Sequence, residues 1–448
     1  MIRLRVILVA IILLALPAFC GAAELNWIAH WLGEEKREQL VMEVAKEFRF
    51  LYPDTDLNIE FALTMEGEGK TVKWKSAYRI AEMVRSGDIT ADVVLLDTII
   101  YEYVAELLGD PYWGKKHIED VSSLPWFRAS QKDFILSSPY YREQTGGILV
   151  GPYIEGLFTC LWVNQEVERR VGLEVKNRGM TLEDFFSYAA RLEEYNRIHN
   201  TFIPLIKLCS WNRLDVLFEY LFKSLLEDPA FAITEVYHPE KERLFLETLL
   251  VFEKLASYGT AINVDFADLE YKDCVRAYLD GDGLFFVAGS YMYNHLLGIY
   301  PEKYANALPV EPPVINYSNG LVGDYIPVFA VMKKSPNKEA ALNLLRLWSE
   351  PKIADKWVSY TKNPTGIKGH LQSPASESGG DVYNDYIRDM TERYSHLPMR
   401  YFQGLTYIFG DRNPVTPYEL RENLARILGG SLSARDYYED VIRRFRDS

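Results

Sequence analysis

Several aromatic, carboxylate and hydroxyl side chains of this chain fall directly after stretches that read as β-strands. Flat aromatic rings can cover the C–H faces of a polar solute, while carboxylates and hydroxyl groups bond its hydroxyls. Open α/β sheets place ligands at the loops that follow the strands, so these side chains are candidates for noncovalent recognition of a small, hydroxyl-rich molecule. The candidates that follow strands or apolar segments are Trp31, Glu34, Asp97, Trp211, Ser290 and Tyr291. Three further candidates are Tyr153 and Glu155, at an expected crossing between two lobes, and Asp324, after the loop 320–323.

Most of these candidates also have a structural interpretation, which the sequence leaves open. Trp31 and Trp211 could be core aromatics rather than ligand contacts. Asp97 could cap the helix that follows it, and Glu155 could be a solvated residue. Ser290 and Tyr291 follow the strongly apolar strand 284–288, and this position makes them candidates.

Signatures of catalysis and of metal binding are missing from the sequence. Neither HExxH nor GxSxG occurs, and the seven His residues have no metal-ligand spacing. The stretch 69–71 (GKT) resembles the end of a phosphate loop, but that motif needs a glycine where Thr64 stands. The stretch 280–283 (DGDG) offers too few oxygens for an EF-hand and predicts a turn between a helix and a strand. We therefore expect no catalytic residue, no metal and no cofactor.

The elements that must position the candidate residues follow a strand–helix order in the first part of the chain. The apolar run 93–96 suits a parallel strand that helices cover on both faces. The expected strands are 25–29, 57–63 and 93–96, and the expected helices are 34–51 and 76–86. This order predicts a βαβ lobe.

The remainder of the chain repeats the pattern less regularly. Thr181 is the expected cap of one helix, and Ser335 is the expected cap of another that has Pro336 at its first position. The expected strands are 157–163, 284–288 and 326–332, and the other expected helices are 165–171, 213–227, 240–257, 417–427 and 433–446. Residues 309–323 are rich in Pro, Gly and Asn and read as a crossing segment.

The N-terminus has the features of a secretory signal peptide. Arg3 and Arg5 precede the uncharged run 6–16, which is too short to span a bilayer, and small residues follow it. We expect residues 1–23 to be removed and the mature chain to be secreted, either periplasmic or at the cell surface. Cys20 leaves open the alternative of a lipid-modified N-terminus.

Length, charge and cysteine content limit the function further. With 448 residues, the chain is longer than one core usually supports, so two lobes are expected. Its net charge of -14 disfavours nucleic acid and anionic lipid as partners. The mature chain keeps Cys160, Cys209 and Cys274, which allow either one disulfide, between Cys209 and Cys274, or three buried thiols.

Five segments, taken together and in order, resemble one known family. They are 44–59 (VAKEFRFLYPDTDLNI), 86–97 (SGDITADVVLLD), 151–173 followed by 181–185 (TLEDF), 281–291 (GDGLFFVAGSY) and 335–348 (SPNKEAALNLLRLW). The chain is similar to the extracellular solute-binding proteins of ABC importers, in the carbohydrate-binding branch that includes maltose-binding protein. Val163 stands where the family usually has Tyr, and Tyr291 stands where it often has Trp.

The resemblance implies an α/β fold with two lobes of the periplasmic-binding-protein type II, joined by a hinge of several chain crossings. The expected divisions are residues 24–150 and 309–360 for the N-lobe, and residues 151–308 and 361–448 for the C-lobe. A small solute, a sugar or oligosaccharide, would be held between the lobes and delivered to an ABC permease by a monomeric protein that is not an enzyme. The alternatives are a sensory binding protein that presents its solute to a membrane receptor and, least favoured, a secreted carbohydrate hydrolase.

Overall fold

The computed structural model of this protein describes most of the expected mature chain. The described residues are 23–29, 31, 35–61, 69–210, 213–226, 236–293, 296, 300, 302–315, 322–361, 363–369 and 405–447. The expected signal peptide and Cys20 lie outside these ranges, as do Glu34 and Trp211. Among the helices within these ranges, none has the length and hydropathy that a membrane crossing requires.

The chain forms two compact units, and each unit is built from two segments of the sequence. Unit 1 consists of Met1–Ile154 and Pro327–Ala354, and unit 2 consists of Glu155–Ile326 and Asp355–Ser448. The predicted second segment of the N-lobe began at residue 309. The structure keeps the chain in unit 2 until Ile326, because a strand that ends there pairs with the long strand that opens unit 2.

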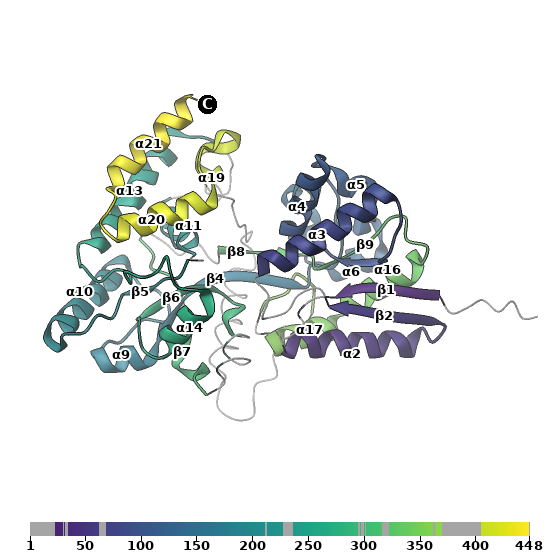
Figure 1. Ribbon diagram of the computed structural model, residues 1–448, viewed down its shortest axis with the longest axis horizontal. Coiled ribbons are helices and arrows are strands. Elements are labelled where there is room, and N and C mark those ends of the chain that lie inside the picture. The colour runs from purple at the N-terminus through teal and green to yellow at the C-terminus, as the bar shows by residue number, and fades with distance from the viewer. Residues whose placement is uncertain are drawn as a thin grey trace, which may run out of the picture. The chain divides into compact units, whose positions relative to one another are not determined.

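Unit 1 contains a four-stranded sheet with the strand order β2-β1-β3-β9. Strand β1 is parallel to β2 and to β3, and β9 returns antiparallel to β3, so the predicted βαβ pattern is present. In Figure 1, α2 lies on one side of β1 and β2, and α3 lies on the other. Its elements are β1 (Ala23–Ala29), α2 (Glu35–Leu51), β2 (Thr55–Phe61), α3 (Gly69–Ser86), β3 (Val93–Leu95), α4 (Thr98–Leu108), α5 (Trp113–His117), η1 (Val121–Ser123), α6 (Pro125–Ser130), α7 (Asp133–Ser137), α8 (Pro139–Glu143), β9 (Phe329–Val331) and α16 (Lys338–Trp348).

A buried carboxylate joins the two segments of unit 1 and corrects one prediction. Asp92 accepts hydrogen bonds from the Asn26 backbone N–H at 2.8 Å and from the Ser335 hydroxyl at 2.6 Å. Ser335 was predicted to cap the following helix, but the N-cap of α16 is Asn337. The prediction was wrong because α16 begins only at Lys338, so the Asn337 N–H from which the Ser335 Oγ accepts, at 3.0 Å, lies before the helix.

Unit 2 contains a sheet with the strand order β5-β6-β4-β7, and β8 also pairs with β4. The pairing of β5 with β6 is parallel and all pairings of β4 are antiparallel. Its elements are β4 (Glu155–Asn164), α9 (Gln165–Val171), α10 (Leu182–His199), β5 (Ile206–Lys207), α11 (Leu214–Leu225), α13 (Pro239–Ala256), α14 (Tyr271–Leu279), β6 (Phe285–Gly289), η2 (Tyr304–Asn306), β7 (Ala307–Val310), β8 (Val322–Ile326), α19 (Thr406–Phe409), η3 (Gly410–Arg412), α20 (Pro417–Leu428) and α21 (Ala434–Asp447). Helix α17 (Pro351–Thr361) begins in the last segment of unit 1 and ends in unit 2.

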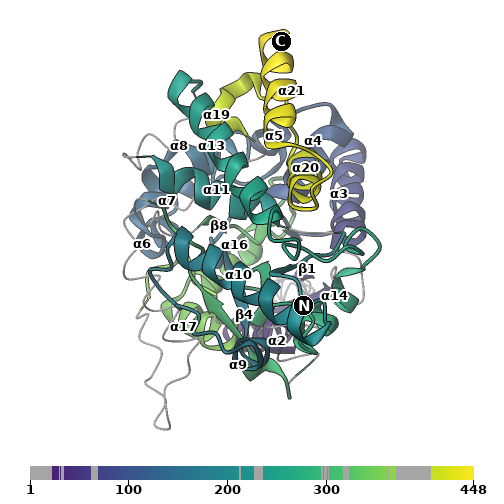
Figure 2. The same ribbon diagram turned by 90° about the vertical axis from the view of Figure 1, so that its left-hand side faces the viewer.

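The C-terminal helices of unit 2 form a layer of their own. Helices α20 and α21 both pack on α13, and α20 also packs on α11, as the views from two directions show (Figures 1 and 2). Figure 2 places the C-terminus at the end of α21. Helix α20 of this layer carries Arg421, which pairs with Asp215 of α11.

Helix starts in unit 2 follow from local residues. Thr181 caps α10 as predicted, through a capping box in which its hydroxyl accepts from the Asp184 N–H and the Asp184 carboxylate accepts from the Thr181 N–H. Asn164 caps α9, and Gly172 ends it with φ of 71°. Because both signals are local, the sequence predicted the bounds of α9 correctly.

Candidate functional site

The unit 1 candidates lie among structural contacts. Asp97 lies two residues after the end of β3 and caps α4, since its Oδ1 accepts a hydrogen bond from the Ile100 N–H at 2.8 Å. The Tyr153 hydroxyl donates to the Tyr141 carbonyl oxygen at 3.2 Å, and its ring meets the Tyr141 ring edge-on. The capping interpretation of Asp97 is thus correct, and a ligand contact by either side chain stays a prediction.

Trp31 lies in the aromatic core of unit 1. Its side chain is fully buried, and its ring centroid is 5.8 Å from that of Phe329 and 6.2 Å from that of Trp348. The Arg37 guanidinium lies 5.5 Å from the Trp31 ring centroid. Its backbone has φ of 71°, which is rare for a residue with a side chain. These contacts give Trp31 a packing role, and its contact with a solute is not needed to explain them.

Two candidate carboxylates share one face of the unit 2 sheet. Glu155 and Asp324 belong to the antiparallel strands β4 and β8, in which Glu155 is opposite Ile326 and Leu157 is opposite Asp324. Residues two apart on a strand share a face, so the two carboxylates are diagonal neighbours, with Cα atoms about 7–8 Å apart in such pairs. Both are buried, with exposed fractions of 4% and 6%. Buried carboxylates need hydrogen-bond donors, which is the property a site for hydroxyl groups would use.

Tyr291 lies in a polar cluster at the end of β6. Ser290 and Tyr291 follow the last residue of this strand, and the Tyr271 hydroxyl donates to the Sδ of Met292, the next residue along, at 3.6 Å. Burial raises the pKa of both phenols. Arg213 and Arg421 face the Tyr291 phenol and act in the opposite direction on its pKa. Tyr291, which was predicted to lie at the end of a strand, is therefore surrounded by hydrogen-bond donors and acceptors.

The two arginines share one carboxylate. Arg421 from α20 pairs with Asp215 of α11: its Nη2 donates to Oδ2 at 3.0 Å, and its Nε lies 2.9 Å from Oδ1. Arg213 reaches the same Oδ1 at 3.6 Å. We name Arg213, Asp215, Tyr271, Tyr291 and Arg421 the Tyr291 cluster. A charge-assisted hydrogen bond restrains both of its side chains, so the cluster presents positioned polar groups beside an aromatic ring.

The ionic row continues along α11. Glu219, one turn beyond Asp215, pairs with Lys223 a further turn along, and both side chains are buried. Burial raises the pKa of Glu219, while Lys223 acts in the opposite direction. The pairing of Glu219 with Lys223 was not predicted from the sequence. Its signal was available, because charged residues four apart at positions 215, 219 and 223 mark one face of an otherwise apolar helix.

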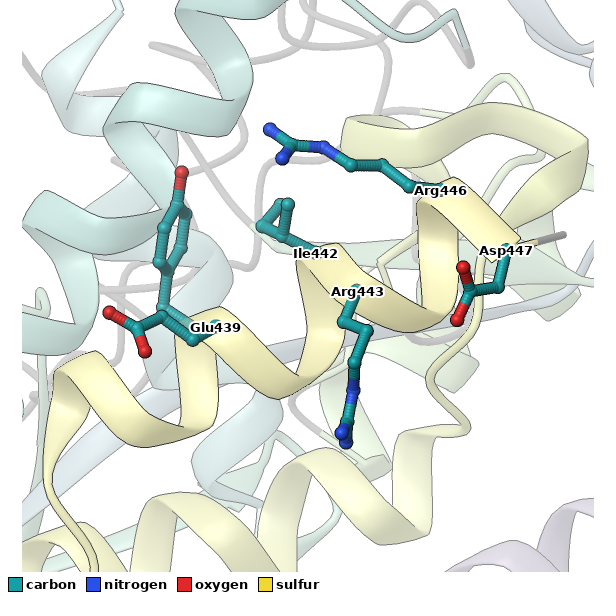
Figure 3. A pocket seen from close by; sticks show the side chains of 6 residues that line it. Glu439, Ile442, Arg443, Arg446 and Asp447 are labelled. Atoms are coloured by element: carbon teal, nitrogen blue, oxygen red, sulfur yellow. The ribbon is translucent and has the colours of Figure 1, made fainter.

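A surface groove of about 530 Å³ lies elsewhere in unit 2, against α13 and α21. Tyr237 and Tyr438 donate their hydroxyls to Glu242 in this groove, at 2.6 and 3.0 Å. A smaller hollow of about 320 Å³ adjoins it on α21, where Ile442 and Arg446 project from one side of the helix and Arg443 from the other (Figure 3). Neither hollow contains a candidate residue from the sequence analysis, so we do not assign the solute site to them.

Metal chemistry finds no support in the described part of the chain. Within those residues, no group of three or more His, Cys, Asp or Glu side chains is placed to hold a metal ion. The stretch 280–283 forms a turn between α14 and β6, as the sequence predicted.

Comparisons with known proteins identify the fold. No family model matches the sequence, and no curated protein matches it. Solved structures do match over nearly the whole chain. The apo form of RafE from Streptococcus pneumoniae has a TM-score of 0.63 at 13% identity, covering 96% of this chain and 99% of that one. MsmE, a binding protein of Bacillus subtilis in an open conformation, has a TM-score of 0.60 at 15% identity, covering 96% and 98%.

A third match, the GacH receptor of Streptomyces glaucescens, has a TM-score of 0.59 at 14% identity and covers 94% of this chain and 99% of that one. This chain therefore has the two-unit α/β fold of extracellular solute-binding proteins, which confirms the predicted fold class. Identities this low establish the fold alone, so the solute has to be argued from the residues.

Proposed function

We propose that this protein is an extracytoplasmic solute-binding protein that captures a sugar or oligosaccharide and delivers it to an ABC permease. The Tyr291 cluster is the observation that supports this function most. It combines an aromatic side chain, two phenol hydroxyls, two guanidinium groups and a carboxylate at a strand end. This is the mixture of ring face, donors and acceptors that a hydroxyl-rich solute needs.

The fold supports the same ligand class. RafE, which shares the fold at 14% identity, was solved in complex with raffinose, and GacH was solved with acarbose. Binding in the micromolar range requires about -8 kcal/mol, which an aromatic platform and several charge-assisted hydrogen bonds can supply. In this proposal Ser290, Glu155 and Asp324 are further solute contacts on unit 2. Glu34, Asp97, Tyr153 and Trp211 stay as predicted contacts for mutational testing, whereas Trp31 is assigned to the core.

The protein works outside the cytoplasm. The predicted signal peptide takes the chain out of the cytoplasm, and Cys20 is the residue at which a lipid anchor would be attached. The protein acts as a monomer, makes no bond and breaks none. Size-exclusion chromatography with light scattering tests the monomer, and the mass of the mature N-terminus tests both cleavage and the anchor.

Titration calorimetry against a panel of neutral oligosaccharides tests the binding function. Tyr291→Ala should weaken the binding of whichever panel member binds by about tenfold, because loss of a stacking ring and its hydroxyl costs about 1.4 kcal/mol. Tyr418→Ala is the matched control, since Tyr418 is 70% exposed on α20 and lies outside the Tyr291 cluster. An unchanged affinity in Tyr291→Ala would show that the Tyr291 cluster does not bind the solute. Release of reducing sugar would show that the protein is a hydrolase and not a binding protein.

A further inference from the structure

Two cysteines of unit 2 lie on segments that are hydrogen-bonded to each other. Cys209 follows β5, and Cys274 lies within α14. The residue before Cys209 is held from both sides, because the Leu208 N–H donates to Asn263 Oδ1 at 2.7 Å and Asn263 Nδ2 donates to the Leu208 carbonyl oxygen at 3.1 Å. On the other side of Cys209, the Ser210 N–H donates to the Leu269 carbonyl oxygen at 3.1 Å. The backbone around Cys209 is thereby fixed beside the start of α14.

The two sulfur atoms meet inside this arrangement. The Cys274 Sγ donates to the Leu208 carbonyl oxygen at 3.1 Å, and the Cys209 and Cys274 thiols are in hydrogen-bonding contact. Cys209 is 1% exposed and Cys274 is fully buried. Both are present as thiols in this structure. A disulfide requires two cysteines whose backbones approach closely, and the hydrogen bonds around Leu208 provide that approach.

We propose that Cys209 and Cys274 become a structural disulfide when the chain matures outside the cytoplasm. Oxidising compartments form and keep such bonds. The oxidant is a protein or small molecule that carries a reactive disulfide. One cysteine thiolate attacks that disulfide and displaces one of its sulfurs, and the second thiolate then attacks the mixed disulfide. The cystine forms, both cysteines lose their protons, and the two sulfurs of the oxidant leave as thiols with those protons and the two electrons.

The surroundings fit oxidation before folding is complete. The neighbouring Cys209 thiol and burial both raise the pKa of Cys274, so the folded pair has little of the reactive thiolate. Both cysteines are also buried in the folded unit, so an oxidant reaches them while the segment between them is still exposed. Loss of the Cys274 S–H donor leaves the Leu208 carbonyl oxygen paired, since Asn263 still donates to it.

The disulfide would restrain the position of Tyr271 in the Tyr291 cluster. Tyr271 lies one turn before Cys274 on α14, and its hydroxyl donates to the Sδ of Met292, the residue after Tyr291, at 3.6 Å. Cross-linking α14 to the end of β5 fixes the helix that holds Tyr271. The two cysteines are positioning residues in this scheme and do not touch the solute.

The first test counts thiols. The protein is exported through its own signal, unfolded without reductant, alkylated and measured by intact mass. We expect one alkylated thiol, Cys160, and a proteolytic fragment pair joined through Cys209 and Cys274. Alkylation of both Cys209 and Cys274, or a disulfide that includes Cys160, would overturn the proposal.

The pairing can also be tested apart from export and from the proposed function. Reduced, unfolded protein is refolded in a glutathione redox buffer, in which the cystine should form before the chain becomes resistant to protease. Reductant should lower the melting temperature of the oxidised wild type and of Cys160→Ser by about 8 °C, because a disulfide restrains the unfolded chain. It should not change that of Cys274→Ser, and an equal effect on all three would refute the bond. None of these readouts needs a solute, so failure of the sugar-binding proposal would leave them intact.

Discussion

Two aspartates in one turn of unit 2 should respond very differently to the same substitution. Asp280 and Asp282 both follow α14, and each pairs with a lysine. The Asp282 carboxylate lies 2.7 Å from the Nζ of Lys207, whose side chain is 2% exposed on β5. Asp280 pairs with Lys303, and the side chains of that pair are 50% and 33% exposed. We predict that Asp282→Asn destabilises the protein far more than Asp280→Asn.

The size of the difference follows from the burial of the lysine. At about 4 Å and an effective dielectric of about 20, two charges attract by about 4 kcal/mol. Asp282 is 47% exposed, so solvent screens part of this attraction, and removal of its charge should cost about 2 kcal/mol. The Asp280 pair is solvent-exposed on both sides and should be worth about 0.5 kcal/mol. Asparagine keeps the shape and an acceptor oxygen, so the comparison isolates the charge.

Urea unfolding followed by circular dichroism measures both changes. The ratio of the two losses, about four to one, is the informative quantity, because both variants share the same turn and the same chemistry. Lys207→Met provides a further check, since it removes the buried charge itself and should cost less than Asp282→Asn. Equal losses in the two aspartate variants would show that the burial of Lys207 does not govern the strength of its ion pair.

Three further changes test other parts of the structure. Gly151→Ala should unfold unit 1 or prevent its folding, because a Cβ there would lie 1.8 Å from the Phe329 carbonyl oxygen, and soluble expression reports the effect. Trp31→Ala should lower the free energy of unfolding by about 3–5 kcal/mol, as for a core aromatic; a stable variant with lost solute affinity would instead assign Trp31 to the site. The hydrogen bond from Lys176 is the main cause that lowers the pKa of the Asp184 carboxyl, so folding favours the ionised carboxylate. The stability that Asp184 contributes should be present above its unfolded pKa and be lost as the pH falls through its folded pKa. Acid unfolding curves should show this loss in the wild type and not in Asp184→Asn.

The sequence predicted those parts of the fold that depend on neighbouring residues. Helix α9 begins at an Asn cap and ends at a glycine with positive φ, and α10 begins with a capping box, so the bounds of α9 and the start of α10 could be predicted. The expected strand 326–332 contains β9, but the short strand β7 was not predicted. Residues 309–323 were read as a crossing segment, although Pro309 pairs with Trp162 in the sheet of unit 2. There the long-range pairing overrides the local preference of proline and glycine for loops.

The candidate site shows the same division. Tyr291 was predicted because it directly follows an apolar strand, which is a local feature. Its partner Arg421 was not predicted, because the pair that Arg421 makes with Asp215 spans 206 positions of the chain. Asp97 illustrates the opposite case, in which a polar residue after a strand serves the next helix. Position at a strand end selects candidates, whereas tertiary contacts decide which of them share a cluster.

Native mass spectrometry of the protein purified from a host that exports it tests the central claim most directly. We predict a bound small molecule at one copy per chain, with the mass of a sugar or oligosaccharide, that is released unchanged when the protein is gently unfolded. Tyr291→Ala should carry less of it than Tyr418→Ala. A retained peptide, polyamine or phosphate ester, or a bound oligosaccharide that shortens with time, would contradict the account.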